Sequence, residues 1–202
     1  MQLLVWSIYR YFFQQPEWVD EFIIKPLVFV VPVVWFVLRR EKQKLNSIGL
    51  TWKNTYPSLL MGLSVGGLFF IEGLLANGLK YGSITIQPIA VIETYGLPMV
   101  LLLSLATSFS EELLGRGFYF SRLFAITKRF WWATIMSTLL FMAFHVPILV
   151  TTLRFYGSTL VIFFVTTAVL GVANCFLYAR TRSLLAPILV HFFWNVTVAV
   201  FL

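Results

Sequence analysis

Six long apolar segments run through the chain and limit what it can fold into. They cover residues 22–38, 57–79, 94–115, 131–150, 158–179 and 184–202. An α-helix needs about 20 apolar residues to cross the hydrocarbon core of a bilayer. Inside that core every backbone amide must be hydrogen-bonded within the protein, and a helix achieves this within one segment. The sequence therefore predicts an all-α fold, a polytopic transmembrane helix bundle with about six spanning helices.

The composition excludes a soluble domain. Of the 202 residues, 59% are hydrophobic and 11% are charged, and the mean hydropathy is +0.87. Soluble domains carry about 25% charged residues. The net charge of +7 does not indicate a nucleic-acid partner, because the basic residues cluster beside the apolar segments. Cys175 is the single cysteine, which excludes an internal disulfide framework, and we expect it to be buried.

The first residues form a separate short amphipathic segment. Ser7, Arg10 and Gln14 recur at helical spacing within residues 2–15 and make a narrow polar stripe on an otherwise apolar helix. This pattern predicts an N-terminal helix that lies in the membrane interface. A half-inserted hairpin arm is the alternative.

Basic residues are unevenly distributed between the two sets of loops. One set carries Arg39, Arg40, Lys42, Lys44, Lys53, Arg116, Arg122, Lys128, Arg129, Arg180 and Arg182. The other set carries Arg10, Lys25, Lys80 and Arg154. Cytoplasmic loops are enriched in Lys and Arg. We therefore expect the first set, in segments 39–56, 116–130 and 180–183, to face the cytoplasm and both termini to lie outside.

The second segment, residues 57–79, is rich in glycine. It contains Gly62, Gly66, Gly67 and Gly73. Small residues at an interface let two membrane helices approach closely. We therefore expect this segment to pack tightly against a neighbouring helix.

Two adjacent carboxylates, Glu111 and Glu112, lie at the end of the third apolar segment. Ionisable groups at membrane depth are costly and are candidates for function. Successive residues on a helix point about 100° apart, so the two cannot share a direction. Glu112 precedes Arg116 by four residues, the favourable order for an ion pair. Glu111 has Gly115 at the equivalent position, so we expect Glu111 to be a free acid beside a gap and Glu112 to be its support.

Both histidines of the chain, His145 and His191, lie in apolar segments. If the third and fourth segments form a hairpin that turns near residue 128, Glu111 and His145 lie level with each other. A polar stripe of Ser104, Thr107, Ser108 and Glu111 and a second one of Thr134, Thr138, Phe141 and His145 suit helices that face one wet cavity. Ser and Thr that bond to their own backbone carbonyls are the alternative explanation. We expect a cavity lined by Ser104, Ser108, Glu111, His145, His191 and Asn195 to open toward the cytoplasm.

The ordered motifs EELLGR, FMAFH and HFFWN resemble those of the CPBP intramembrane protease family, also called the Abi or CAAX-protease family. The family pattern is EExxxR, FxxxH and HxxxN on successive core helices. The family includes type II CAAX prenyl endopeptidases and bacterial relatives linked to bacteriocins and peptide pheromones. The resemblance covers about residues 95–200, which we expect to be the catalytic core of a single integral-membrane domain, residues 1–202.

The resemblance implies an intramembrane endopeptidase. By resemblance, Glu111 and His145 would activate water. His191 and Asn195 would stabilise the oxyanion. The supporting residues would be Glu112, Arg116 and Phe141. Peptide hydrolysis needs a base for water and donors for the oxyanion, and these residue types supply both.

A metal-dependent mechanism is the alternative. Glu111, His145 and His191 form a His₂Glu set with room for water, as in catalytic zinc sites, and the family is often named a metalloprotease. The sequence contains no HExxH motif. We favour metal-independent hydrolysis driven by the glutamate, with no cofactor, and Zn²⁺ remains the alternative.

Two non-enzymatic functions also fit the sequence. One is a membrane scaffold or bacteriocin-immunity protein that keeps the fold without cleaving. The other is a proton-coupled transporter, because Glu, His and Arg inside helices also form proton relays; the lack of an evident inverted repeat weakens it. For the peptidase, we expect a multi-pass protein of a bacterial plasma membrane. Its partners would be membrane lipid and a membrane-associated peptide or protein substrate. A prenylated substrate would require a host that prenylates proteins.

Overall fold

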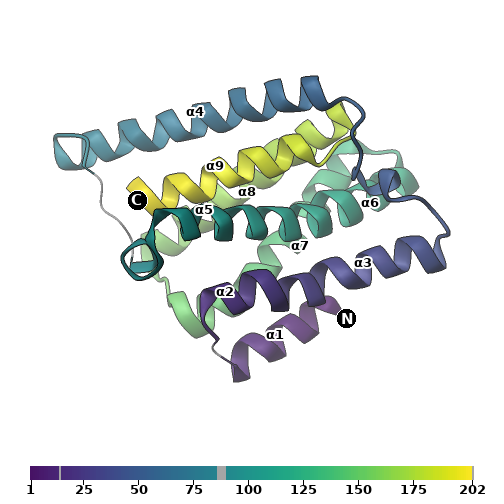
Figure 1. Cartoon of the computed structure of the whole chain (residues 1–202), viewed down its shortest axis with the longest axis horizontal. Coiled ribbons are helices and arrows are strands. Elements are labelled where there is room, and N and C mark those ends of the chain that lie inside the picture. The colour runs from purple at the N-terminus through teal and green to yellow at the C-terminus, as the bar shows by residue number, and fades with distance from the viewer. Residues whose placement is uncertain (14, 86–89, 202) are drawn as a thin grey trace.

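The computed structural model describes residues 1–13, 15–85 and 90–201, and these residues form helices and connecting turns without a β-strand. Five helices are long and apolar enough to cross a membrane: Glu17–Arg40, Thr55–Tyr81, Ile92–Thr127, Phe130–Leu153 and Gly157–Thr181. A sixth apolar helix, Leu185–Phe201, is shorter. The helices lie side by side along one direction (Figure 1). The predicted all-α polytopic bundle is confirmed. Gln14, the third residue of the predicted polar stripe, lies outside the described residues.

The first span is a chain of short helical segments. They are α2 (Glu17–Val19), the π-helices η1 (Asp20–Ile24) and η2 (Pro26–Val30), α3 (Val31–Trp35), and the π-helix η3 (Phe36–Arg40). Proline has no N–H group, so Pro26 and Pro32 interrupt the regular ladder of backbone hydrogen bonds. Such wider turns inside a helix are frequent at functional sites. The interruption falls directly beside Lys25, which is buried.

The N-terminal helix α1 (Gln2–Phe12) packs against the first span and against α7 (Phe130–Ile148). The Trp6 indole Nε1 donates to the Phe144 carbonyl over 3.1 Å. Tyr9 and Arg10 both donate to the Asp20 carboxylate. Partial burial and the Asp20 carboxylate raise the pKa of Tyr9 above its usual range, so the phenol stays a donor. These contacts hold α1 against the first span and α7. The position of α1 in the membrane interface stays a prediction.

The third span is longer than the sequence predicts. It joins α5 (Ala90–Glu112), the π-helix η5 (Leu113–Phe120) and α6 (Ser121–Thr127). The predicted cytoplasmic loop 116–130 is therefore wrong, and only Lys128 and Arg129 separate this span from α7. The charge of Arg116 does not end the helix, because its ion pair with Glu112 lets it stay fully buried. Lys128 has a φ of 56°, which turns the chain back at the predicted position.

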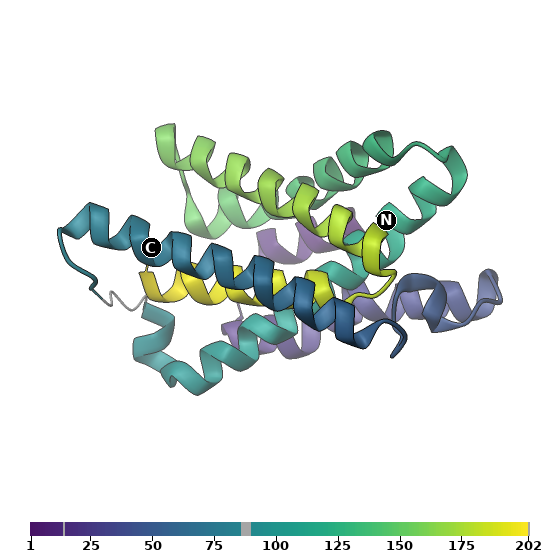
Figure 2. The same ribbon diagram turned by 90° about the horizontal axis from the view of Figure 1, so that it is seen from above.

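The remaining elements pack around α9. After the 3₁₀-helix η4 (Leu45–Ile48) comes α4 (Thr55–Tyr81), which packs along α9 (Leu185–Phe201). The π-helix η6 (Leu149–Leu153) extends α7, and α8 (Gly157–Thr181) packs on α7 and α9. Figure 2 shows α8 on one side of the pair of α4 and α9, and α5 on the other side. Helices α5, α7 and α9, which carry the three motifs, thus meet inside the bundle.

Close packing of α4 on α9 follows from three of the five glycines in α4. A Cβ atom added at Gly62, Gly66 or Gly73 would come within 3.0 Å of a side-chain atom of α9. The shortest of these separations, at Gly73, is 2.0 Å from a methyl carbon of Thr197. The prediction is wrong for Gly67, where an added Cβ would meet nothing within 4 Å.

Candidate active site

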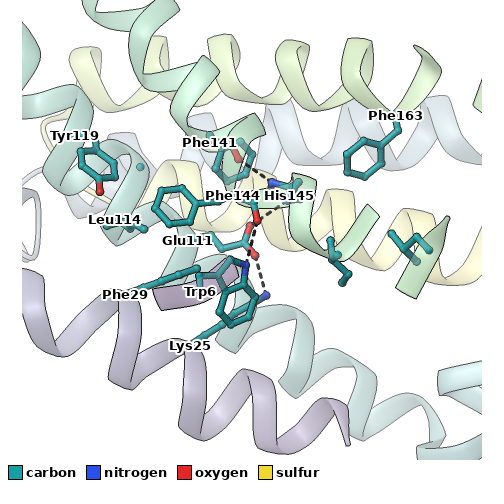
Figure 3. A pocket seen from close by; sticks show the side chains of 13 residues that line it. Trp6, Lys25, Phe29, Glu111, Leu114, Tyr119, Phe141, Phe144, His145 and Phe163 are labelled. Atoms are coloured by element: carbon teal, nitrogen blue, oxygen red, sulfur yellow. Dashed lines mark hydrogen bonds and ion pairs between the residues drawn. The ribbon is translucent and has the colours of Figure 1, made fainter. Parts of the chain in front are cut away.

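Glu111 is buried where the first span, α5, α7 and α9 meet, and its two oxygens face different partners. Oε1 accepts a hydrogen bond from the Lys25 ammonium over 2.8 Å. Oε2 lies 3.7 Å from Nε2 of His145 and 3.8 Å from Nε2 of His191. Among the described residues, Oε2 has no hydrogen-bond partner. Figure 3 shows Glu111 between Lys25 and His145. The structure thus brings Glu111 and both histidines together, as the depth argument predicts.

Each histidine is held through its other ring nitrogen. Nδ1 of His145 lies 2.8 Å from the Phe141 carbonyl oxygen, and Nδ1 of His191 lies 2.8 Å from Oε1 of Glu112. A carbonyl or carboxylate oxygen only accepts, so Nδ1 is the donor in both contacts. Both rings are therefore oriented with Nε2 toward Glu111. Their fixed orientation resembles that of histidines whose second nitrogen performs chemistry.

Glu112 fills the supporting role that the helical spacing predicts. Its Oε1 atom accepts from Arg116 Nη1 over 2.8 Å, from Asn174 Nδ2 over 2.9 Å and from His191. The side chains of Glu112 and Arg116 are both fully buried. Asn174, on α8, also donates to the Pro187 carbonyl of α9 over 3.3 Å. Glu112 therefore connects α5, α8 and α9 around the site.

Phe141 lies between the buried cation and the histidines. The Arg116 guanidinium carbon is 4.4 Å from the centre of the Phe141 ring. The ring centre of Phe141 is 4.7 Å from that of His145 and 5.9 Å from that of His191. The aromatic face attracts the guanidinium, and the ring edges fix the imidazoles. The first residue of FxxxH thus supports the site through its ring and its carbonyl.

An apolar pocket of about 160 Å³ adjoins Glu111 and His145. Its walls are Trp6, Phe29, Leu114, Tyr119, Phe141, Phe144, Ile148, Leu153 and Phe163, with Gly115 and Lys25 beside Glu111. A Cβ atom added at Gly115 would meet only Phe141, at 3.8 Å. The predicted gap beside Glu111 is therefore present, and it is continuous with this pocket.

A second, polar cavity of about 630 Å³ lies next to Asn195. Its lining includes Ser104, Thr107 and Asn195, and Asn195 Nδ2 is 3.4 Å from the Ser108 hydroxyl. The predicted lining is thus divided. Ser104 and Asn195 line this cavity, and Glu111 and His145 line the apolar pocket, whereas Ser108 and His191 line neither of the two. The polar cavity also borders Gln15 and Pro16, Thr94 and Tyr95, and Thr152 and Leu153. These lie at the helix ends remote from the basic turns. The opening of the site toward the cytoplasm stays a prediction.

Lys25 is the site residue that sequence reasoning missed. Glu111 has no partner of opposite charge within its own helix, but Lys25 supplies one from the first span, so the expected free acid is wrong. A lysine inside the apolar run DEFIIKPLVFV is itself a signal, because charged residues at membrane depth are functional candidates. Glu21, four residues earlier, is 2.7 Å from the Lys25 ammonium.

The residues present do not fit a zinc ion well. The candidate ligands are Glu111, His145 and His191, and the Lys25 ammonium lies 2.8 Å from their one carboxylate. In the part of the chain that the structure describes, no group of three His, Cys, Asp or Glu side chains is placed to hold a metal ion. A cation so close to a ligand oxygen opposes binding of a divalent ion.

Comparison with known proteins identifies a matching protein family. Residues 93–197 match the family described as type II CAAX prenyl endopeptidase Rce1-like. No curated protein and no solved structure matches the chain. The matched segment contains all three motifs and excludes Lys25. Since the match covers just over half of the 202 residues, the chain belongs to the Rce1-like family of type II CAAX prenyl endopeptidases.

Proposed function

We propose that this protein is an intramembrane endopeptidase that hydrolyses a peptide bond with a water activated by Glu111 and His145. Membership of the family supports a CAAX-type intramembrane endopeptidase in general. The observation that carries the proposal is the position of Glu111 Oε2, 3.7 and 3.8 Å from the two imidazole Nε2 atoms. An acceptor oxygen without a partner beside two oriented imidazoles suits a site for water and a carbonyl group.

The water step uses the geometry of Glu111 and His145. With Nδ1 of a neutral His145 donating to the Phe141 carbonyl, Nε2 is an acceptor. A water that donates one hydrogen to this nitrogen and one to Glu111 Oε2 directs a lone pair at the scissile carbonyl carbon. Attack forms the C–O bond, and the carboxylate takes the proton. The same proton then passes to the leaving amine as the C–N bond breaks.

His191 and Asn195 are the proposed donors for the oxyanion. To donate through Nε2 while Nδ1 donates to Glu112, His191 must be an imidazolium, and Glu112 is the counter-charge of that form. A donor aimed at developing charge in a site without water contributes strongly to catalysis. Asn195 Nδ2 lies 3.4 Å from the Ser108 hydroxyl, and we propose that it turns toward the oxyanion when the substrate binds.

The apolar pocket supports a substrate with one large apolar residue beside the scissile bond. An apolar cavity of roughly 150 Å³ accommodates a benzene ring, and this pocket measures about 160 Å³. It suits one aromatic or branched aliphatic side chain. We therefore propose a membrane-associated peptide or protein as the substrate, with hydrolysis that requires no metal ion.

The test uses purified protein in liposomes and two quenched fluorescent peptides. One ends in a farnesylated cysteine, two aliphatic residues and a final residue; the other lacks the farnesyl group. Glu111→Gln and His145→Ala are each expected to lower kcat at least about 100-fold, the usual contribution of a general base. Glu72→Gln is the matched control, since it removes an exposed carboxylate of α4. Treatment with a chelator is expected to leave the wild-type rate unchanged.

Three results would contradict the proposal. Cleavage by the Glu111→Gln protein at the wild-type rate would remove the assigned mechanism. A wild-type protein that cleaves neither peptide would favour a non-catalytic membrane protein of the same fold. Reversible loss with a chelator, restored by Zn²⁺, would transfer the mechanism to the His₂Glu set.

A further inference from the structure

A closed ring of contacts joins the first span to α5 at Glu111 and at Thr107, one turn before it. Lys25 Nζ lies 2.8 Å from Glu111 Oε1 and 2.7 Å from Glu21 Oε1. Glu21 Oε2 accepts a hydrogen bond from the Thr107 hydroxyl over 2.6 Å. Thr107 is four residues before Glu111 on α5, one helical turn away. The contacts therefore start on α5, cross to the first span, and return to α5.

We propose that Lys25 is a positioning residue for Glu111 in the proposed peptidase. Fixed by Glu21 and Thr107, its ammonium group holds Oε1 of Glu111 so that Oε2 faces both histidines. The inference rests on the proposed function. It adds a residue that lies outside the segment matched by the family, residues 93–197.

The rotation of the Glu111 carboxylate depends on this ammonium group. Oε2 is 3.7 and 3.8 Å from the two Nε2 atoms, beyond the length of a direct hydrogen bond. Without Lys25, the carboxylate is free to turn and to bond directly to one imidazole. Such a bond occupies the position that the attacking water requires. Lys25 therefore keeps the separation that the reaction needs.

The burial of Lys25 requires the same contacts. Lys25 is 7% exposed and Glu111 is 8% exposed. An ammonium group in such an interior is tolerated when it is paired with carboxylates. One cation between two carboxylates gives the cluster of Lys25, Glu21 and Glu111 a formal charge of −1. A test must therefore separate positioning from simple charge balance.

The N-terminal arm fixes the first span at this position. Trp6 packs with its ring centre 5.1 Å from that of Phe29, one turn after Lys25, and bonds to Phe144 of α7. Asp20, before Lys25, binds Tyr9 and Arg10 of α1. The backbone on both sides of Lys25 is thus connected to α1, and the ammonium group is presented at a constant place.

The experiment measures kcat and KM on the farnesylated peptide for four variants in liposomes. Lys25→Met removes the cation and keeps the length of the side chain. Lys25→Arg keeps the cation. Glu21→Gln keeps the contact of Lys25 with Glu111. Lys25→Met with Glu21→Gln returns the cluster to its formal charge of −1 without the ammonium group. Thermal unfolding in detergent is measured for each protein.

A positioning role has a specific signature. Lys25→Met is expected to lower kcat about 100-fold with KM unchanged, which is the cost of misplacing a reacting group by about 1 Å. Lys25→Arg is expected to recover part of kcat. Glu21→Gln is expected to lower kcat less than Lys25→Met does, because the ammonium group stays beside Glu111. The double variant should regain thermal stability over Lys25→Met but not kcat.

The outcomes distinguish this inference from the proposed function. If Lys25→Met cleaves with the wild-type kcat, or if the double variant regains kcat, Lys25 has no positioning role. A wild-type protein that does not cleave the peptide would overturn the proposed function, and this inference would fall with it.

Discussion

Glu111 and Glu112 are neighbours on one helix and have different surroundings. Glu112 is fully buried, and one of its oxygens accepts hydrogen bonds from three different helical segments. Glu111 divides its two oxygens between Lys25 and the side of the histidines. Substitution of Glu112 should therefore affect stability as well as activity, whereas substitution of Glu111 should chiefly affect activity.

Removal of Glu112 should leave several buried donors without an acceptor. Glu112→Ala and Arg116→Ala are each expected to lower the free energy of unfolding by about 3–5 kcal/mol, as for one partner of a buried ion pair. The double variant should lose less than the sum, because the two residues are in contact. Denaturant unfolding in detergent measures the three values.

The matched control for this cycle is the partly exposed pair of Arg122 and Glu41, with side chains 22% and 21% exposed. Its coupling free energy should be smaller, since water screens the charges. Additive losses for Glu112 and Arg116 would show that the two residues are not coupled.

Substitutions of Gly115 test whether the apolar pocket binds the substrate. Gly115→Ala should fold and cleave normally, because the added Cβ meets only Phe141 at an ordinary contact distance of 3.8 Å. Gly115→Leu should fill space beside Glu111 and raise KM for a peptide with a large apolar residue next to the scissile bond. A peptide with alanine at that position should be affected less. If Gly115→Leu raises KM equally for both peptides, the pocket does not bind the residue beside the scissile bond.

At the scale of the helices, the bundle depends on how closely α4 approaches α9. Membrane helices have no hydrophobic driving force for association, so close van der Waals packing supplies much of the attraction. Gly62, Gly66 and Gly73 face α9, while Gly67 faces away from it. Because α9 carries His191, this contact also fixes one wall of the site.

The glycines of α4 provide a prediction with an internal control. Gly73→Ala places a methyl group 2.0 Å from a carbon of Thr197, so it should lower the free energy of unfolding by about 1–3 kcal/mol, the usual cost of overpacking. Gly67→Ala meets no atom within 4 Å and should be neutral or stabilising, since alanine favours a helix. Unfolding in detergent compares the two, and equal effects would contradict the packing of α4 on α9.

For the whole molecule, the sequence predicts what depends on local spacing or on depth along a helix. The all-α bundle, the pair of Glu112 and Arg116, and the level of His145 with Glu111 follow from such rules. The contact of Lys25 with Glu111 spans 86 residues and depends on which helices become neighbours. The sequence also does not predict the length of the third span. Arg116 pairs with Glu112 and is buried, so its charge does not end the helix.

The orientation of the molecule remains a prediction from the basic turns. If these face the cytoplasm, the polar cavity beside Asn195 opens at the opposite, outer end. Lys128→Cys should then resist an impermeant thiol reagent added to intact cells, and Glu93→Cys should react. Cys175 is buried, so the parent protein should not react with the reagent. Labelling of position 128 from outside would invert the topology and move the cavity to the cytoplasmic side.

The contact of Glu21 with Lys25 has a consequence for biogenesis. The first span leaves the ribosome long before Glu111 is synthesised, so its lysine must enter the membrane without its later partner. Glu21, one turn away, neutralises Lys25 within the same nascent helix and lowers the cost of insertion. Glu21 thus serves first as the temporary partner of Lys25, and later shares it with Glu111. We expect Glu21→Gln to reduce the amount of protein inserted in the membrane more than the activity of each molecule that has folded.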